Sequence, residues 1–410
     1  MFWDRSRSKR SAFRSGPSSL ALGRGANLDA GGGQLIADRS DWGHQWRTSP
    51  KERMAASSRA NKARKVVRSM SRAESGSPIR VFSTCPMSTA VDQSSYLQRV
   101  IDVARWSDEA GCEGILVYTD NSLVDPWLLA QIILQNTERL CPLVAVQPVY
   151  MHPYAVAKLV TTCAHLYSRR VILNMVAGGF PRDLFALDDD ASHDRRYNRL
   201  VEYTTIVQHL LADADPVTFS GEFYRVKNLS LSPPLPLALF PGFTVSGSSV
   251  AGMRAARALG ATAVQYPKPA GEYQGVHAGS AADLGVRVGI IARDETAQAW
   301  DVAWNRFPGD RKGQLMHQLA MKTSDSVWHR QLSQLGLESR AYETPYWLHP
   351  FENYATFCPY LVGSYAEVAG EVAHYIAKGF RTFILDIPPS RADLEHVNIV
   401  FEQAARRVAR

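Results

Sequence analysis

A short segment between a predicted strand and a predicted helix carries residue types that bind anions. It reads VSGSSVAGMRAARALGA over residues 245–261, so Gly247, Ser248 and Ser249 lie where an apolar strand gives way to a helical pattern. Glycine allows a close backbone approach, and the first amides of a helix lack partners within the helix, so this position favours a phosphate or a carboxylate. Serine is also a preferred helix cap, and the pattern alone is compatible with simple capping. A nucleophilic serine is disfavoured, because the GxSxG motif needs a glycine where Ala251 stands.

Five further side chains occupy positions that suggest ligand binding. Asn174 and Val176 end the apolar run RVILNMV, and the Ala-Gly-Gly that follows would let a ligand approach the backbone. His193 and Tyr197 lie four residues apart in a predicted helix, so they share one face and could hold a phosphate or a ribityl chain, although His193 could equally be a solvated or capping residue. Arg287 lies within the apolar run VRVGII, where it needs either an anion or a buried carboxylate as its partner.

The rest of the chain lacks the patterns of common hydrolases, kinases and metalloenzymes. It has no paired carboxylates, no Ser-His-Asp order and no phosphate-binding P-loop. The 11 His and 5 Cys residues show no spacing typical of zinc, and we expect no metal. The scattered cysteines, without a CxxC pair, indicate reduced thiols of a cytosolic protein. These features favour a pocket for a phosphorylated organic cofactor that itself carries the reactivity.

These residues would be positioned by an alternation of short strands and longer amphipathic helices. Runs rich in β-branched and aromatic residues predict strands at 79–84, 114–119, 143–148, 170–176, 242–247, 262–266, 286–291 and 381–387. Helical patterns lie between them, which is typical of parallel β/α units. The sequence therefore predicts an α/β fold, an eight-stranded parallel TIM barrel, with functional groups at the carboxyl ends of its strands.

Two segments interrupt this alternation. Residues 217–231 predict a β-hairpin with Ser220-Gly221 at its turn. Residues 294–363 lead from helical patterns into an aromatic-rich stretch at 342–360, YETPYWLHPFENYATFCPY. Because long insertions on a barrel often cover the substrate, we expect this stretch to form a lid.

Charge is distributed unevenly along the 410 residues. Residues 1–78 contain 16 Lys and Arg against 6 Asp and Glu, whereas residues 79–410 contain 30 against 33. The first segment is rich in Arg, Ser and Gly without sustained apolar periodicity, so we expect a disordered extension before a single barrel domain at 79–410. The predicted domain is not basic, so we expect no nucleic-acid partner. No run of 18 apolar residues occurs, and we expect a cytoplasmic protein without a membrane partner.

Five ordered motifs resemble the bacterial luciferase-like flavin-dependent monooxygenases, nearest the alkanesulfonate and long-chain alkane monooxygenase branch. They are LNMVAGG, SHDRRYNRLVEYTTIVQHLL, VTFSGEFYRVKNLSLSPPLP, VSGSSVAGMRAARALGA and YLVGSYAEVAGEVAHYIAKGFRTFIL, and the likeness covers about residues 79–405. The resemblance implies a β/α barrel that binds reduced FMN at its C-terminal face and uses O2 to oxygenate a small molecule. It also implies a separate NAD(P)H:flavin reductase that supplies the reduced FMN, and a homodimer or homotetramer.

The same resemblance assigns seven residues to the cofactor. Those at the flavin phosphate are Gly247, Ser248 and Ser249, with Tyr197 nearby, and those at the ribityl chain and ring are Asn174, Val176 and His193. Arg287 matches an arginine of the sulfonate branch and is expected to be catalytic.

Other pocket positions differ from the sulfonate branch. The differences are Leu123 for a cysteine, Tyr266 for a tryptophan, Tyr354 near a lid arginine, Gly289 for a histidine and Pro388 for a tyrosine. We expect Leu123, Tyr266 and Tyr354 to contact a substrate that is less anionic than a simple alkanesulfonate.

Two other functions remain open at this point. Relatives in the same superfamily are deazaflavin-dependent dehydrogenases or reductases, which exchange hydride and need no O2. Others are flavin-binding proteins without catalysis, which bind FMN and consume no reducing equivalents.

Overall fold

The computed structural model describes residues 78–179, 181–212, 215–273, 283–315, 317 and 344–409. Residues 1–77, which make up nearly all of the predicted N-terminal extension, lie outside the described residues, so the domain boundary stays a prediction. Part of the predicted insertion, 318–343, lies outside them as well.

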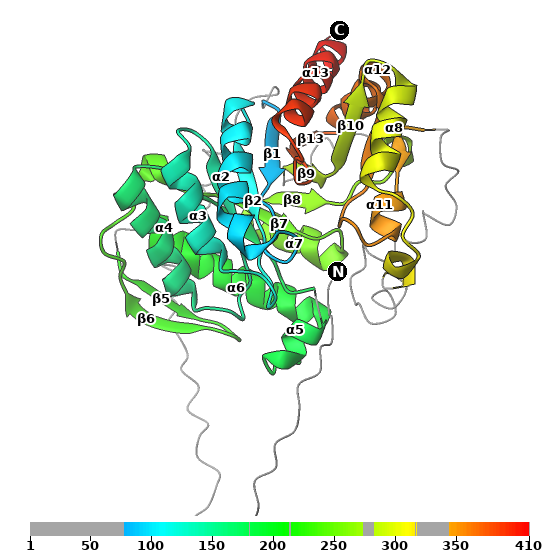
Figure 1. The fold of residues 1–410 in the computed structure, drawn as a ribbon. Helices are drawn as coiled ribbons and strands as arrows, with labels where there is room; N and C mark the ends of the chain where they lie inside the picture. Colours follow the sequence, from blue (N-terminus) through cyan, green and yellow to red (C-terminus); the bar gives the residue numbers. More distant parts are fainter. Residues whose placement is uncertain are drawn as a thin grey trace, which may run out of the picture. The chain divides into compact units, whose positions relative to one another are not determined.

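Eight parallel strands close into a barrel, as the sequence predicts (Figure 1). They are β1 (Arg80–Thr84), β2 (Gly114–Val117), β3 (Cys141–Val146), β4 (Ile172–Met175), β7 (Gly242–Ser246), β8 (Thr262–Gln265), β9 (Leu284–Arg287) and β13 (Phe380–Ile384). The order around the barrel is β1-β13-β9-β8-β7-β4-β3-β2. The barrel closes where Val81 of β1 pairs with Phe383 of β13.

Helices connect the strands and lie around the barrel (Figure 1). They are α2 (Gln93–Glu109), α3 (Pro126–Asn136), α4 (Pro153–Tyr167), α5 (Pro181–Ala186), α6 (His193–Ala212), α7 (Val250–Leu259), α8 (Thr296–Arg306), α11 (His349–Glu352), α12 (Tyr365–Ala377) and α13 (Arg391–Val408). Local chemistry sets several starts. The Asp125 carboxylate accepts from two amides of α3, and Ser364 with Glu367 forms a capping box on α12. Among the described residues, no helix is both long and apolar enough to cross a membrane.

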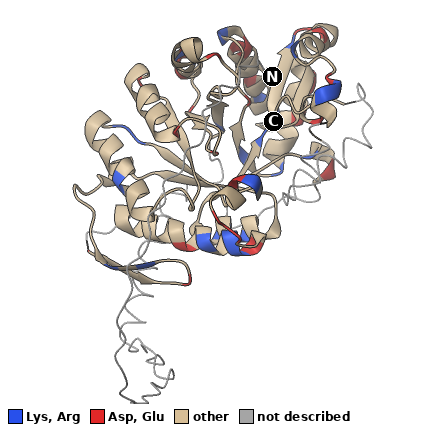
Figure 2. Cartoon of the chain, turned by 60° about the horizontal axis from the view of Figure 1, so that its bottom comes forward, with Lys and Arg blue, Asp and Glu red and all other residues tan. Residues whose placement is uncertain are grey.

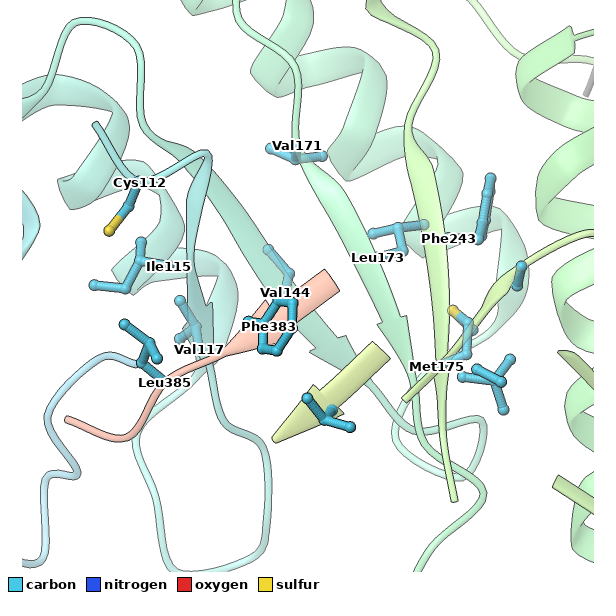
Figure 3. Packing of buried hydrophobic residues seen from close by; sticks show 14 of the residues in the cluster. Cys112, Ile115, Val117, Val144, Val171, Leu173, Met175, Phe243, Phe383 and Leu385 are labelled. Carbon is cyan, nitrogen blue, oxygen red and sulfur yellow. The ribbon is translucent and has the colours of Figure 1, made fainter. Parts of the chain in front are cut away.

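Side-chain alternation along the strands divides the apolar core into two parts. Leu116 of β2 belongs to a buried cluster with Phe82, Leu143 and other residues of the barrel strands. Its neighbours Ile115 and Val117 belong instead to the large cluster that packs strands against helices (Figure 3). Successive residues of a strand point to opposite faces, so a continuous apolar run such as GILV fills the barrel and binds its helices together.

The predicted strand 286–291 is wrong as a single element. β9 ends at Arg287, and β10 (Gly289–Arg293) leaves the barrel to pair with β12 (Tyr360–Ser364), while β11 (Tyr346–Trp347) pairs with the other side of β12. The change occurs at Val288, whose amide still donates to Ile384 of β13, whereas the next amide donates to Pro359. An uninterrupted apolar pattern gives no sign of this change of partner.

The predicted hairpin is confirmed, with its turn displaced. β5 (Val217–Ser220) and β6 (Arg225–Leu229) pair antiparallel, and Ser220 is paired with Arg225, so the turn comprises residues 221–224. The Glu202 carboxylate of α6 accepts hydrogen bonds from three consecutive amides of this turn, those of residues 222, 223 and 224. This contact fixes the hairpin against the helix that begins with His193.

Charged residues of both signs are interspersed over the helices (Figure 2). Ion pairs link separate elements, as between Arg195 and Glu222, Arg391 and Glu109, and Arg80 and Glu113. This mixed surface agrees with the near balance of charge over residues 79–410.

We predict that Gly114→Ala destabilises the protein by about 2 kcal/mol or more, because core overpacking is costly. A Cβ at this position would overlap the carbonyl oxygen of Cys141 and lie 2.9 Å from the Phe82 ring. Urea denaturation measures the loss. Gly309→Ala is the matched control, because a Cβ there meets no atom within 4 Å. Equal stabilities of the two variants would contradict the prediction.

Candidate active site

Three adjoining cavities lie at the carboxyl ends of the barrel strands. The barrel cavity, about 160 Å³, is lined by Asn174, Tyr266, Arg287, Phe357 and others. The serine cavity, about 90 Å³, lies at the start of α7 and shares Val176, Gly179 and Ser246 with the barrel cavity. The rim cavity, about 320 Å³, shares Thr119, Asp120, Leu123, Ala145 and Gln147 with the barrel cavity. The three therefore form one series across the C-terminal face.

The serine cavity is built by the turn from β7 into α7. The Ser249 hydroxyl caps α7 by accepting from the Gly252 amide at 3.1 Å, and the Ser248 hydroxyl oxygen accepts from the Tyr266 amide at 3.4 Å. The Ser248 hydroxyl keeps a proton to donate to a ligand, whereas the Ser249 hydroxyl also forms a hydrogen bond with Tyr197. Gly247 has φ +149°, and a Cβ there would overlap the Tyr197 hydroxyl, so glycine is required at this turn.

The opposite wall of the serine cavity comes from the first turns of α6. Tyr197 donates to the Ser246 carbonyl at 3.2 Å, and its ring packs edge-on against His193 at 5.1 Å. Burial raises the pKa of Tyr197, so its hydroxyl stays protonated. His193 Nδ1 lies 2.8 Å from an Asp194 carboxylate oxygen, which orients the imidazole.

Sequence reasoning missed Arg196, which also lines the serine cavity. Its side chain is buried, and its guanidinium donates to the Ala191 carbonyl at 2.8 Å. A cation beside the amino end of α7 adds to the attraction of this cavity for an anion. The run SHDRRYNR contains the signal, because Arg196 directly precedes Tyr197.

Asn174 is held in a fixed orientation in the barrel cavity. It is buried, and its Oδ1 accepts from the hydroxyls of Thr244 at 2.8 Å and Ser246 at 2.9 Å. Because both donors act on the oxygen, the Nδ2 protons are available to a ligand. Val176, two residues later, lines both the barrel and the serine cavities.

Arg287 lies in the wall of the barrel cavity at 5% exposure. Its guanidinium carbon lies 4.6 Å from the centre of the Tyr118 ring, and Nη2 lies 3.7 Å from an oxygen of Asp386. Nε and Nη2 find no hydrogen-bond acceptor among the described residues. The sequence allows a buried carboxylate as the partner of Arg287. Asp386 is such a partner, at the distance of an ion pair and not of a hydrogen bond.

The three predicted substrate residues are divided between cavity wall and surface. Leu123 lines the barrel and rim cavities, and Tyr266 lines the barrel cavity, where burial raises its pKa far above the usual value. Tyr354 is 39% exposed and lies outside the described lining. Phe357, whose ring centre lies 5.9 Å from that of Tyr354, lines the barrel cavity in this part of the chain.

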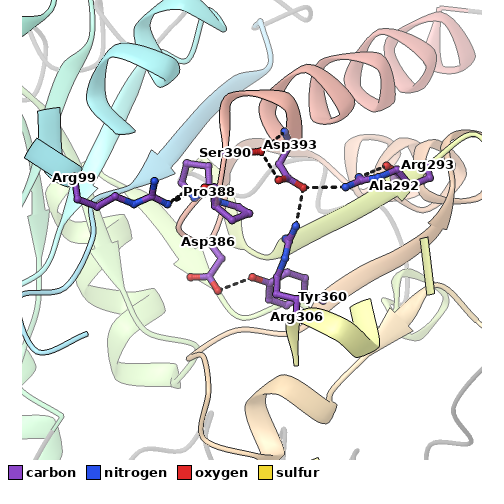
Figure 4. A network of polar contacts seen from close by, with 10 residues as sticks. Arg99, Ala292, Arg293, Arg306, Tyr360, Asp386, Pro388, Ser390 and Asp393 are labelled. Atoms are coloured by element: carbon purple, nitrogen blue, oxygen red, sulfur yellow. Dashed lines mark hydrogen bonds and ion pairs between the residues drawn. The ribbon is translucent and has the colours of Figure 1, made fainter. Parts of the chain in front are cut away.

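The structure bears on two positions that differ from the sulfonate branch, Gly289 and Pro388. A Cβ on Gly289 would overlap the Tyr360 ring, so a histidine does not fit there. Pro388 lies outside the described lining of the barrel cavity, and its carbonyl accepts from Arg99 at 3.4 Å (Figure 4). Within the described ranges, no three His, Cys, Asp or Glu side chains gather as a metal site would require.

We predict that Gly289→Ala destabilises the protein by about 1–3 kcal/mol, because the added methyl group displaces a buried ring. In a Tyr360→Ala background the same change should cost at least about 1 kcal/mol less, since contacting residues couple. Urea denaturation of the four proteins in this double-mutant cycle measures the coupling. A cost that is the same in both backgrounds would show that the ring does not exclude a side chain at 289.

Comparison with known proteins agrees with this geometry. Residues 78–382 match the family model described as luciferase-like monooxygenase. The chain is similar to 4-(gamma-L-glutamylamino)butanoyl-[BtrI acyl-carrier protein] monooxygenase BtrO of Niallia circulans, with 34% identity over 316 residues, 76% of this chain and 92% of the relative.

Solved structures share the fold at lower identity. EDTA monooxygenase (EmoA) from Chelativorans sp. BNC1 is 15% identical with a TM-score of 0.64, covering 81% of this chain and 94% of that one. An F420-dependent secondary alcohol dehydrogenase is 15% identical with a TM-score of 0.56, covering 80% and 99%. From the family match and the 34% identical relative, we conclude that the chain is a monooxygenase belonging to the luciferase-like monooxygenase family.

Proposed function

We propose that the protein binds reduced FMN across the serine and barrel cavities and uses O2 to oxygenate a small organic substrate. The observation that carries the proposal is the adjacency of the two cavities. A phosphate-sized space at a helix start shares Val176 and Ser246 with a larger space whose wall contains Arg287. A flavin mononucleotide has the same two parts, a phosphate and a ring joined by a polyol chain.

The residues present fit such a cofactor. Donors for the phosphate are the hydroxyls of Ser248 and Ser249, together with the guanidinium of Arg196 and the amino end of α7. The Tyr197 hydroxyl, whose proton is donated to the Ser246 carbonyl, lies beside them. Gly247 keeps the cradle open, because any Cβ there would meet Tyr197. In this proposal His193, Asn174 and Val176 follow the ribityl chain toward the ring.

When bound, the reduced flavin supplies the electrons that activate O2. The protein's own residues exclude water and position the substrate. Leu116, Val264, Ile384 and Phe357 give the barrel cavity a largely apolar wall, which limits access of water to the reacting atoms. Arg287 lies in the wall of this cavity, where its guanidinium would attract an oxygen atom of the substrate.

We further propose that the substrate is an acyl group attached to a carrier protein. The name of the 34% identical relative specifies such a substrate for that relative. The rim cavity supports the idea here, since it adjoins the barrel cavity and would give a tether space beside it. A simple alkanesulfonate is not the substrate in this proposal, because Gly289, Tyr266 and Leu123 replace residues of the sulfonate branch.

The proposal includes the expected partners. A separate NAD(P)H:flavin reductase supplies the reduced FMN, and the protein acts in the cytoplasm as a homodimer or homotetramer. The resemblance to two-component members of the family supports both expectations.

A deazaflavin-dependent dehydrogenase is the second candidate, because the fold is shared with an F420-dependent alcohol dehydrogenase. Such an enzyme would turn over without O2. Anaerobic oxidation of a substrate with a deazaflavin coenzyme would favour it over the monooxygenase.

We predict that replacing both Ser248 and Ser249 with Ala weakens FMN binding by about 1–3 kcal/mol, since hydrogen bonds to a charged group are lost. Riboflavin, which lacks the phosphate, should bind both proteins equally. Flavin fluorescence titration measures both affinities. Ser390→Ala removes a helix cap from α13, outside the described cavity lining, and serves as the control. Unchanged FMN affinity in the double variant would contradict the assignment of the phosphate to this cavity.

The oxygenase activity is tested by stopped-flow absorbance. The protein with reduced FMN is mixed with aerated buffer, with and without S-butanoyl-N-acetylcysteamine as a carrier-thioester mimic. We expect the oxidised-flavin absorbance to return more slowly than without protein, and an oxygenated product to form from the mimic. Oxidation at the rate of free flavin, with no product, would contradict the proposal and direct attention to the deazaflavin or to flavin binding without catalysis.

A further inference from the structure

A partly buried carboxylate lies beside the arginine of the barrel cavity. Asp386 follows β13, and its Oδ2 accepts hydrogen bonds from the hydroxyls of Thr356 at 2.5 Å and Tyr360 at 2.8 Å. Figure 4 shows the Tyr360 contact. Its Oδ1 lies 3.7 Å from Nη2 of Arg287, and the two side chains are 13% and 6% exposed.

Asp386 compensates the charge of Arg287 without accepting a hydrogen bond from its Nε or Nη2. An ion pair at 3.7 Å compensates charge but exceeds hydrogen-bond length. Arg287 Nε and Nη2 thus keep buried N–H groups without an acceptor in the described part of the chain. Such groups are costly to leave unpaired. Because Arg287 lines the barrel cavity, an acceptor atom of a ligand bound there would reduce this cost.

No other described group in the wall restores a positive charge. Among the described residues that line the barrel cavity, the acidic and basic side chains are those of Asp120 and Arg287. Burial and the nearby Asp386 carboxylate raise the pKa of the Cys358 thiol to about 12, although Arg287 lowers it. This thiol therefore stays neutral. With Asp386 included, the surroundings of Arg287 carry no excess of positive charge for an anion.

We propose that Asp386 determines substrate charge: it cancels the charge of Arg287, so the barrel cavity binds the neutral carbonyl oxygen of an amide or thioester and rejects a sulfonate or carboxylate there. The inference rests on the proposed function, which makes the barrel cavity the substrate site.

Two residues near the start of β12 hold Asp386 in place. Thr356 lies shortly before β12, Tyr360 is the first residue of β12, and both are buried. Burial raises the pKa of Tyr360 well above its usual range, and the Asp386 carboxylate raises it further, so Tyr360 remains a donor. The absence of a side chain on Gly289 makes room for the Tyr360 ring. The glycine in place of a histidine and the neutralised arginine are therefore parts of one arrangement.

The test compares binding of matched neutral and anionic probes. Butanamide and S-butanoyl-N-acetylcysteamine are neutral, and butanoate and butanesulfonate are anionic. Calorimetry of the full-length protein, with and without oxidised FMN, gives each affinity. We expect the wild type to bind the neutral probes at least about tenfold more tightly, the size of one charge-assisted hydrogen bond. Asp386→Asn should reverse the preference, with butanesulfonate gaining about tenfold or more.

Asp393→Asn is the matched control. Asp393 is also a partly buried carboxylate, but it pairs with Arg293 and Arg306 and not with Arg287 (Figure 4). This variant should keep the wild-type ratio of affinities. Thermal melts show whether each variant folds. If Asp386→Asn does not fold, the ratio of neutral to anionic probe affinities of the wild type tests the inference.

Two results would overturn the inference. One is a wild type that binds butanesulfonate more tightly than butanamide, and the other is a folded Asp386→Asn protein with an unchanged ratio. Failure of the proposed function has a different signature. If neutral probes are preferred but reduced FMN is oxidised as in free solution without product, the charge inference stands and the oxygenase does not. If product forms while anions bind better, only the inference fails.

Discussion

Closure of the parallel barrel is the constraint on which the candidate site depends. Residues 81 and 383 pair across about three hundred positions of sequence, and this pairing brings the carboxyl ends of all eight strands to one face. Asn174, Ser246 and Arg287 come from three different strands and meet in one cavity only because the barrel is closed. Their positions in the sequence, far apart from one another, do not by themselves indicate a common site.

Features written locally in the sequence could be predicted, and features made by distant pairing could not. The Gly-Ser-Ser turn, the strand runs and the pair His193 and Tyr197 each depend on neighbouring residues, and the structure brings them to one cavity. Asp386 was missed, because its relation to Arg287 spans a hundred residues. The break at Val288 was missed because β10 changes partner without any interruption of the apolar pattern.

The small sheet beside the barrel links a backbone feature to the chemistry of the pocket. β10 and β12 pair in parallel, which places Tyr360 over Gly289, and the Tyr360 hydroxyl then holds Asp386. A buried arginine that is neutralised from behind offers hydrogen-bond donors without an excess of charge. In this account the second sheet is part of the substrate site, although none of its strands belongs to the barrel.

The most direct measurement of the central claim is a crystal structure of the protein with FMN. We predict that the phosphate lies within hydrogen-bond distance of Ser248, Ser249 and Tyr197, and that the ring lies in the barrel cavity beside Arg287. A phosphate bound elsewhere, or a ring that lies outside the barrel cavity, would contradict the claim that the two adjoining cavities form one flavin site.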